Sequence, residues 1–370
     1  MENLPYELLY TVIEKQLIST DYWSDDYYIS VSDYDTILSL AIVSNTWQSI
    51  VKPFYLKLKP MMPPLILLTH ASHCYLFNIV REEFLAIQLP QLHRRWVRSC
   101  SHEWLLTITH DFPYQIRLLN PLSRASIRLP PMWNRFEGLE ELKVTVSTSP
   151  SDPNCVILAR HAEESKLAFC RPGDRTWTRL RPAQNRYSSA IFYKDQLYLI
   201  EYGTSDVLNL LRCIDLGRLV SITQKSIQKP ERCLSVDTYL VDSSADLLLI
   251  LKYNYWDDIK LSGMGCTYGY SCELSNPLFE VYKLQNRDWV EVDNVGENAI
   301  YLSPNCSVSM PATDMDECTA NRIYFFDASG DETGYMTGVY HIKNRYVELA
   351  YQSSPSWTAP LSWFTPELRS

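Results

Sequence analysis

FEVYKLQNRDWVEVD, residues 279–293, carries the pattern that decides how this chain folds. Residues 279–284 and 288–293 are rich in Phe, Val, Tyr and Trp, which pack well on pleated surfaces, and Asn286-Arg287 between them suits a turn. Two short strands joined by two turn residues are typical of an antiparallel hairpin. The stretch therefore predicts a β-hairpin, and it defines a unit that recurs along the chain.

Five other stretches repeat this strand–turn–strand pattern in a looser form: residues 75–90, 116–130, 166–180, 211–223 and 338–350. Two further apolar runs precede most of these hairpins, as Asp237–Val241 and Leu247–Leu251 do before the hairpin above. Four strands per repeating unit are typical of a propeller blade. A β-sandwich fits less well because the strand pairs recur with one internal order. The sequence thus predicts a mainly β fold, a β-propeller of about six four-stranded blades over residues 65–366.

The first fifty residues follow a different, helical period. Leu4, Leu8 and Ile13 lie at helical spacing, and Pro5 suits a first helical position. A second apolar run follows Asp35, an N-cap residue, and stops at proline 53. Residues 1–56 therefore predict a small all-α domain, joined to the propeller by a proline-rich linker at residues 57–64. Such a helical pair is too small to own a core, so it is either a brace for the propeller or a handle for another protein.

The helical segment resembles an F-box, the motif by which substrate receptors join a Skp-type adaptor and a cullin–RING ubiquitin ligase. The resemblance rests on Leu-Pro-x-x-Leu-Leu at residues 4–9 and on Val-Ser-x-x-Trp at residues 43–47. Residues 22–28 lengthen the usual spacing between these two motifs. By this resemblance, the adaptor-binding residues are Leu4, Pro5, Leu8, Ile13, Leu17, Val43, Ser44 and Trp47.

The β region resembles the KIB-type β-propeller family. Matching motifs include Asn-Pro-Leu-Ser at residues 120–123, Tyr-Lys-x-x-Leu-Tyr at residues 193–198 and Trp-Phe-Thr-Pro at residues 363–366. In that family an F-box commonly precedes the propeller. The resemblance implies a non-catalytic substrate receptor of an SCF-type (Skp–cullin–F-box) E3 ubiquitin ligase, with the adaptor, the cullin and a protein target as partners. It also implies a protein kinase of the glycogen-synthase-kinase-like class as one such target.

Composition narrows the other partner classes. The formal net charge of -9, without a local basic run, argues against nucleic acid. The longest apolar runs fall far short of the roughly twenty residues that a membrane span needs. The ten cysteines include no C-x-x-C pair, and no basic-then-apolar leader opens the sequence. We therefore expect reduced thiols and a cytoplasmic or nuclear location.

No convincing catalytic set, metal site or cofactor site is evident in the sequence. His70 and His73 have a spacing that metals can use, but no third ligand lies nearby, and in one strand they would point to opposite faces. Asp257 and Asp258 lie beside aromatic residues, as in some glycosidases, although adjacent loop acids are more often simply solvated. A propeller glycosidase is the weaker alternative. A protein-binding propeller without ligase association is the stronger one.

The connection at residues 253–273 is the predicted target-binding element. It is a long, aromatic-rich segment between two strands of one blade, and long connections of this kind are usually functional or disordered. Aromatic side chains on loops supply rigid contact area for binding. The predicted target-binding residues are Tyr253, Tyr255, Trp256, Tyr268 and Tyr270.

Overall fold

The computed structural model of the 370-residue chain describes most of the β region and a few residues of the helical segment. In that described part, no helix is long and apolar enough to cross a membrane. The described residues are 40, 47, 49–53, 64–70, 73–79, 83–131, 142–161, 166–180, 186–202, 206–214, 218–231, 233–243, 246–255, 271–273, 278–303, 306–312, 320–328, 335–352 and 362–365.

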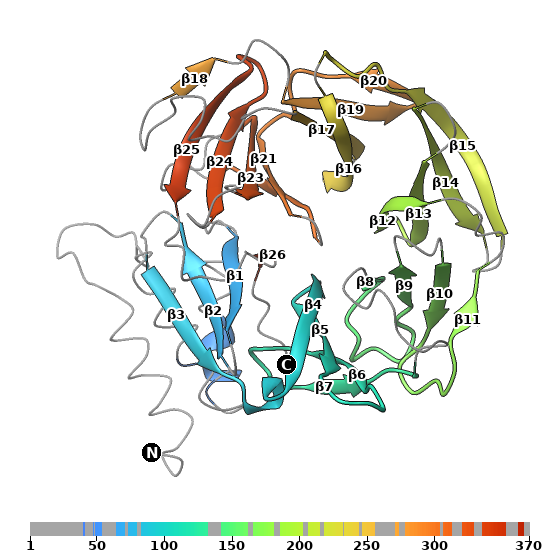
Figure 1. Cartoon of the computed structure of the whole chain (residues 1–370), viewed down its shortest axis with the longest axis vertical. Helices are drawn as coiled ribbons and strands as arrows, with labels where there is room; N and C mark the ends of the chain where they lie inside the picture. Colours follow the sequence, from blue (N-terminus) through green and yellow to red (C-terminus); the bar gives the residue numbers. More distant parts are fainter. Residues whose placement is uncertain are drawn as a thin grey trace.

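Six sheets stand around a central axis, and the chain passes through them in order (Figure 1). Each blade starts with a strand beside the axis and ends with a strand at the rim. Blade 1 is β26 (Ser362–Phe364), β1 (Leu65–His70), β2 (His73–Asn78) and β3 (Glu83–Gln88). Blade 2 follows the 3-10 turn η2 (Pro90–Leu92) and is β4 (Arg95–Ser101), β5 (Trp104–Thr109), β6 (Ile116–Leu119) and β7 (Ser126–Arg128). Blade 3 is β8 (Leu142–Val146), β9 (Ile157–His161), β10 (Lys166–Cys170) and β11 (Thr178–Arg179).

The second half of the ring has two regular blades and one enlarged blade. Blade 4 is β12 (Tyr187–Tyr193), β13 (Gln196–Tyr202), β14 (Val207–Ile214) and β15 (Arg218–Ser226). Blade 5 is β16 (Cys233–Ser243), β17 (Asp246–Tyr255), β19 (Phe279–Gln285) and β20 (Asp288–Glu291). Blade 6 is β22 (Val308–Pro311), β21 (Asn298–Leu302), β23 (Arg322–Ala328), β24 (Tyr335–His341), β25 (Tyr346–Gln352) and β18 (Ser271–Glu273). The prediction of a six-bladed propeller is confirmed.

The prediction of four strands per blade is wrong for blade 6, which has six. One extra strand, β21, runs parallel to β23 and separates it from the inner strand β22. The other, β18, comes from the long connection of blade 5 and pairs with the outer strand β25. β18 is short and pairs with a strand far along the chain, and the parallel pairing of β21 with β23 is not a hairpin, so local sequence patterning did not indicate them.

The hydrophobic core is divided among the seams between blades. Six clusters of buried apolar side chains occur in the described part of the chain, and each joins two adjacent blades. Trp177 lies in the seam between blades 2 and 3, where its indole N–H donates to the carbonyl oxygen of Pro130 at 3.0 Å. Alternating strand residues therefore serve two seams, one on each face of a blade.

The ring is closed by pairing its two ends. Strand β26 lies beside β1, with Leu65 opposite Phe364 and Leu67 opposite Ser362. Trp363 packs against Tyr301 of blade 6, and its indole N–H donates to the carbonyl oxygen of Leu302 at 2.9 Å. The C-terminal strand thus belongs to blade 1 and also seals blade 1 against blade 6.

The described end of the helical segment packs into the seam between blades 1 and 2. Residues 47 and 49–53 are helical. Ile50 and Val51 are fully buried in the same cluster as Leu67 of blade 1 and Leu105 of blade 2. The segment that precedes the propeller is therefore attached to it through core contacts. The boundary at residues 57–64 stays a prediction, because those residues lie almost entirely outside the described part.

Candidate functional site

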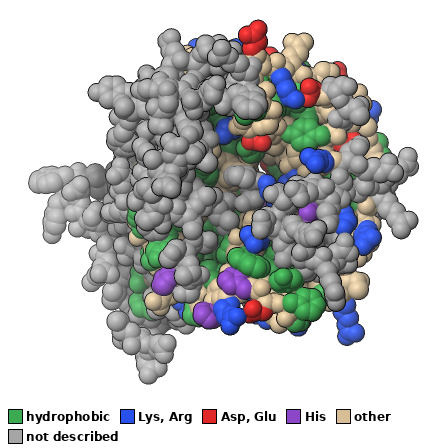
Figure 2. Space-filling view, viewed as in Figure 1, with side chains coloured by type: hydrophobic (Ala, Val, Ile, Leu, Met, Phe, Trp, Pro, Cys, Tyr) green, Lys and Arg blue, Asp and Glu red, His purple; other side chains and the backbone are tan. Residues whose placement is uncertain are grey.

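A cavity of about 650 Å³ lies at the axis of the propeller, where the inner strands of all six blades meet. Figure 2 shows an opening near the centre of the ring on the face in view. The side chains that line the cavity come mainly from the inner strands, because these strands lie nearest to the axis. The lining includes Cys100, His102, Lys143, Arg160, Ser189, Tyr202, Asp242, Ser307 and Trp363.

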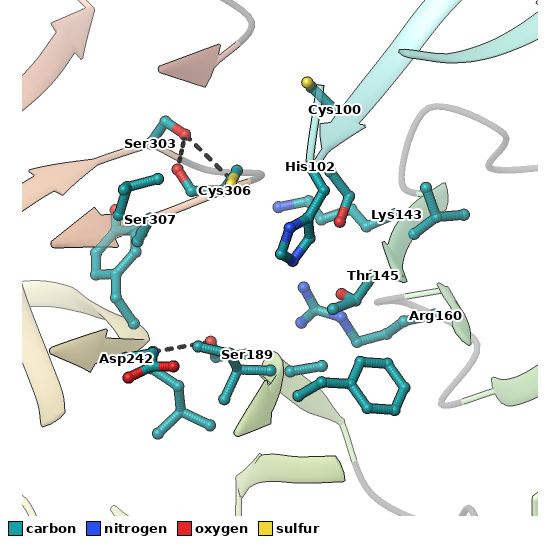
Figure 3. Close-up of a pocket in the computed structure, with 18 of the residues that line it drawn as sticks. Cys100, His102, Lys143, Thr145, Arg160, Ser189, Asp242, Ser303, Cys306 and Ser307 are labelled. Carbon is teal, nitrogen blue, oxygen red and sulfur yellow. Dashed lines mark hydrogen bonds between the residues drawn. The ribbon is translucent and has the colours of Figure 1, made fainter. Parts of the chain in front are cut away.

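Charged side chains of both signs line this cavity, including the carboxylates of Glu103, Asp237 and Asp242. His102, Lys143 and Arg160 come from blades 2 and 3, and Figure 3 shows His102 and Arg160 directed into the cavity. Asp242 and Ser307 lie across from them on blades 5 and 6. Arg160 is 8% exposed, and its guanidinium donates to the carbonyl oxygen of Tyr187 at 2.6 Å. The arrangement suits the recognition of a polar group rather than an apolar ligand.

Hydroxyl groups on the inner strands join neighbouring blades around the cavity. Ser101 accepts a hydrogen bond from the backbone N–H of Val146 on the next blade at 3.2 Å. Ser189 accepts in the same way from the N–H of Leu240 at 3.0 Å. Short hydroxyl side chains on the inner strands can satisfy a buried backbone donor of the neighbouring blade. These contacts fix the inner strands against one another.

Burial shifts the acidity of several groups around the cavity. Burial raises the pKa of the Cys306 thiol to about 11, and it raises the pKa of the Cys100 thiol as well. Both thiols are therefore protonated at neutral pH, and a thiol is a poor nucleophile compared with a thiolate. Burial also raises the pKa of Asp242, although the nearby Lys194 charge opposes that shift. These features favour binding over covalent chemistry.

Of the predicted adaptor-binding residues, only Trp47 lies among the described residues. Its half-buried side chain packs against the cluster between blades 1 and 2, together with Leu40. This end of the helical segment therefore faces the propeller. The other residues of the set lie outside the described part, and their role stays a prediction: Leu4, Pro5, Leu8, Ile13, Leu17, Val43 and Ser44.

Tyr253, one of the predicted target-binding residues, lies in the core of the seam between blades 4 and 5. Its side chain is 1% exposed, and its hydroxyl donates to a carboxylate oxygen of Glu280 at 2.7 Å. A side chain this buried has no surface to offer a partner, so its role is structural. Tyr255 ends strand β17, and the other three residues, Trp256, Tyr268 and Tyr270, lie outside the described part together with Asp257 and Asp258.

Both ends of the predicted target-binding connection are fixed on the propeller. It leaves blade 5 at the end of β17, and its residues 271–273 form β18 on the outer edge of blade 6. Ser271 pairs with Glu348, and Glu273 pairs with Tyr346. The connection therefore links an interior strand of blade 5 to the outer edge of blade 6, which sequence patterning within one blade could not show.

Potential metal ligands do not gather among the residues that the structure describes, since no group of three or more His, Cys, Asp or Glu side chains could hold a metal ion there. The prediction that His70 and His73 would point to opposite faces assumed that both lie in one strand, but they lie in two. They end β1 and begin β2 as the last register pair of a hairpin.

Two relatives from Arabidopsis thaliana resemble this chain along most of its length. The one named provisionally as F-box protein At5g55150 is 22% identical over 369 aligned positions, covering 91% of this chain and 93% of that protein. The F-box protein SKIP23 is 22% identical over 331 positions, covering 76% of this chain and 77% of that protein. Their names agree with the F-box resemblance at the N-terminal end.

Solved structures resemble this chain only distantly. The crystal structure of TolB from Acinetobacter baumannii matches with a TM-score of 0.43 and 10% identity, covering 84% of this chain and 70% of that one. A likeness of this size carries no argument about function. By contrast, the sequence model of the KIB1-4 beta-propeller family matches residues 76–341, from blade 1 through most of blade 6. Because that match spans well over half of the sequence, this chain belongs to the KIB1-4 beta-propeller family.

Proposed function

We propose that this protein is the substrate-recognition subunit of an SCF-type E3 ubiquitin ligase. In this proposal residues 3–53 dock a Skp-type adaptor, and the propeller binds the protein to be ubiquitinated. The proposal is supported most by one combination: a KIB1-4 propeller preceded by a segment that resembles an F-box, in a chain whose relatives carry F-box names. We further propose that the protein acts in the cytoplasm or the nucleus.

The mechanism is proximity rather than catalysis by this chain. A receptor that holds a target lysine near a charged conjugating enzyme raises the effective concentration of the two reactants. That effect requires a fixed distance between adaptor and target. Ile50 and Val51, buried between blades 1 and 2, give the helical segment a firm attachment to the propeller. The attachment supports this mechanism, since a loose tether would dilute the target.

Leu4→Asp combined with Pro5→Ala tests the adaptor interface. Each large apolar side chain buried there contributes roughly 1.5–3 kcal/mol before the costs of association. We expect the tagged wild-type protein to recover the Skp-type adaptor and the cullin from cells, and the double variant to recover neither. The thermal unfolding of the propeller is expected to stay nearly unchanged in the variant, which separates lost docking from lost folding.

Other outcomes of the same pull-down point elsewhere. Equal recovery of the adaptor by the double variant would exclude the proposed docking residues. Absence of adaptor and cullin with the wild-type protein would favour a protein-binding propeller that works outside a ligase. Recovery of a glycogen-synthase-kinase-like kinase with the wild-type protein would support the target class that the family resemblance implies.

A further inference from the structure

Blade 2 and its flanking loops carry a charge opposite to that of the chain as a whole. Residues 94–130 hold six arginines but only one aspartate and one glutamate, in a protein of formal net charge -9. The two acids do not lie together, because Glu103 is at the turn between β4 and β5 and Asp111 is at the opposite end of β5. A local excess of one charge sign at the surface commonly marks the site of a partner of the other sign.

Three of these arginines lie on one face of blade 2, and we call them the arginine row: Arg95, Arg117 and Arg128. Arg117 and Arg128 are register partners on β6 and β7. Arg95 on β4 reaches Thr107 on β5, which is itself the register partner of Arg117. Register partners point to the same face of a sheet, so the three side chains share one face. The row runs across the blade from its inner strand to its rim.

Hydrogen bonds hold the inner half of the arginine row in position. The guanidinium of Arg95 donates to Thr107 Oγ1 at 3.0 Å and to the carbonyl oxygen of Gln115 at 2.7 Å. The guanidinium of Arg117 donates to Gln115 Oε1 at 3.3 Å. Burial, and then the charge of Arg117, lower the pKa of Arg95 to about 10. The two cations are thus kept close to each other by a shared glutamine.

No carboxylate neutralises the arginine row in the part of the chain that the structure describes. The ion pair of blade 2 joins Arg94 to Asp111 at 2.8 Å, and both of these side chains are mostly exposed. None of the remaining ion pairs between described residues includes a member of the row. Neighbouring cations repel each other when no acid lies between them. An anionic partner would therefore gain favourable electrostatic energy from each arginine of the row that it contacts.

The loop between β5 and β6 carries two aromatic residues, and one of them, Tyr114, packs in the seam between blades 2 and 3, on the face of blade 2 opposite the arginine row. Phe112 is 71% exposed and meets Tyr114 edge-to-face, with 6.0 Å between the ring centroids. Arg128 is exposed and Arg117 is half-buried, so the row is open to solvent at its outer end. Arginine is one of the residue types enriched at binding hot spots.

We propose that the arginine row binds an acidic segment of the target protein, one that presents several Asp or Glu side chains. This inference rests on the proposed function, because it names the chemistry of the target that the propeller would recognise. Adjacent strands lie roughly 5 Å apart, so the three guanidinium groups spread over several strand spacings instead of converging on one point. Several carboxylates fit that spread better than a single phosphate group does. The negative charge of the whole chain disfavours nucleic acid.

Fluorescence anisotropy with the purified full chain tests this surface. The probe is a labelled peptide of about eight residues in which glutamate alternates with serine, because alternate residues of an extended peptide share one face. A second probe replaces every glutamate with glutamine. We expect the glutamate peptide to bind, the glutamine peptide not to bind, and the affinity of the glutamate peptide to fall as salt is raised.

Arg117→Gln with Arg128→Gln should weaken binding of the glutamate peptide by about tenfold or more, since each lost ion pair costs affinity. The matched control is Arg175→Gln with Arg287→Gln, which removes the same charge from exposed turns of blades 3 and 5. The control should bind within about twofold of the wild-type protein, because charges further than a Debye length are screened. Circular dichroism of both double variants checks that each is folded.

Several results would overturn the proposal: no binding of the glutamate peptide, equal binding of the glutamine peptide, or equal loss in the control. A phosphoserine peptide that binds tenfold tighter than the glutamate peptide would assign the row to phosphate instead. Residues 21–35 of this chain contain five aspartates. If changing all five to asparagine tightened peptide binding tenfold, the occupant would be the chain itself, not a target. Adaptor recovery should be equal in wild type and both double variants, so a failed ligase assignment would be recognised separately.

Discussion

Small hydroxyl side chains on the inner strands accept hydrogen bonds from backbone N–H groups of the neighbouring blade. Ser101 is 4% exposed and accepts the N–H of Val146, which is fully buried. A buried donor without an acceptor costs free energy comparable to its desolvation. Serine was not selected as functional from the sequence, because a lone serine in a strand carries no local signal. Its role becomes visible only when the next blade is in place.

Ser101→Ala should lower the free energy of unfolding by about 1–3 kcal/mol, because it leaves the N–H of Val146 without an acceptor. Denaturant titration of the full chain measures this change. Ser101→Thr keeps the hydroxyl and should recover part of the loss. Ser151→Ala, at an exposed turn, is the control and should change little. A Ser101→Ala protein as stable as the control would show that the seam does not depend on this hydroxyl.

His341 predicts how stability depends on pH. It is 8% exposed, stacks on Tyr346 with ring centroids 3.8 Å apart, and lies 3.2 Å from a carboxylate oxygen of Glu348. Burial lowers the pKa of His341, which the hydrogen bond to Glu348 partly opposes and the Arg322 charge reinforces. A lowered pKa means that the unfolded chain binds the proton more readily than the folded protein does. Stability is therefore lost as the pH falls below the ordinary histidine value of about 6.5.

The wild-type protein should lose more stability between about pH 7.5 and about pH 5 than a His341→Gln variant does. Thermal unfolding at both pH values measures the difference. His93→Gln is the matched control, since His93 is exposed and should leave the pH dependence as it is in the wild type. A His341→Gln protein with the full wild-type pH dependence would mean that other groups dominate it.

Among the strands, the hairpins could be predicted from the sequence, whereas the strand pairings outside the hairpins could not. The hairpin at residues 279–293 emerged as β19 and β20 because its strand residues and turn are contiguous. By contrast, β18 pairs with β25, far along the chain, and β21 pairs in parallel with β23, which a hairpin pattern does not indicate. Tyr253 was expected on a loop because strand β17 ends at Tyr255, four residues beyond the apolar run that ended at Leu251. The helical period predicted a helix ending near residue 53, but not the seam into which it packs.

Ile50→Ala tests whether the helical segment is part of the propeller's core. Removing a fully buried isoleucine typically costs about 2–5 kcal/mol, so the whole chain should unfold at a clearly lower denaturant concentration. Lys52→Ala, on the same helical turn but half-buried, should change stability by only about 0.5 kcal/mol. An Ile50→Ala protein as stable as the wild type would mean that the segment is a dispensable tail.

Closure of the ring is a property of the whole molecule, and Trp363 is its central side chain. It is 2% exposed, stacks on Phe326 with ring centroids 4.6 Å apart and donates to Leu302. The closing Trp-Phe-Thr-Pro motif was visible in the sequence as part of the family resemblance. Its pairing with β1, some three hundred residues earlier, supplies the inner strand of blade 1 and so holds the two ends of the propeller together.

Trp363→Ala should destabilise the protein by about 3–5 kcal/mol, since it leaves a large cavity between blades 1 and 6. Trp363→Phe should lose less, because the ring still packs and only the hydrogen bond is removed. Trp96→Ala serves as the control at a half-exposed tryptophan, and its cost should be about 1 kcal/mol or less. Denaturant unfolding measures the loss of stability in each variant. Equal losses for Trp363→Ala and Trp96→Ala would contradict a closing role for Trp363.

The central claim is that one chain joins a ligase adaptor to a propeller that reads a target. Size-exclusion chromatography with light scattering on the purified full chain, mixed with a purified Skp-type adaptor, tests it most directly. We expect one complex with one copy of each protein. We expect no complex with the variant that combines Leu4→Asp with Pro5→Ala. Two separate peaks for the wild-type mixture, or a complex that persists in that variant, would contradict it.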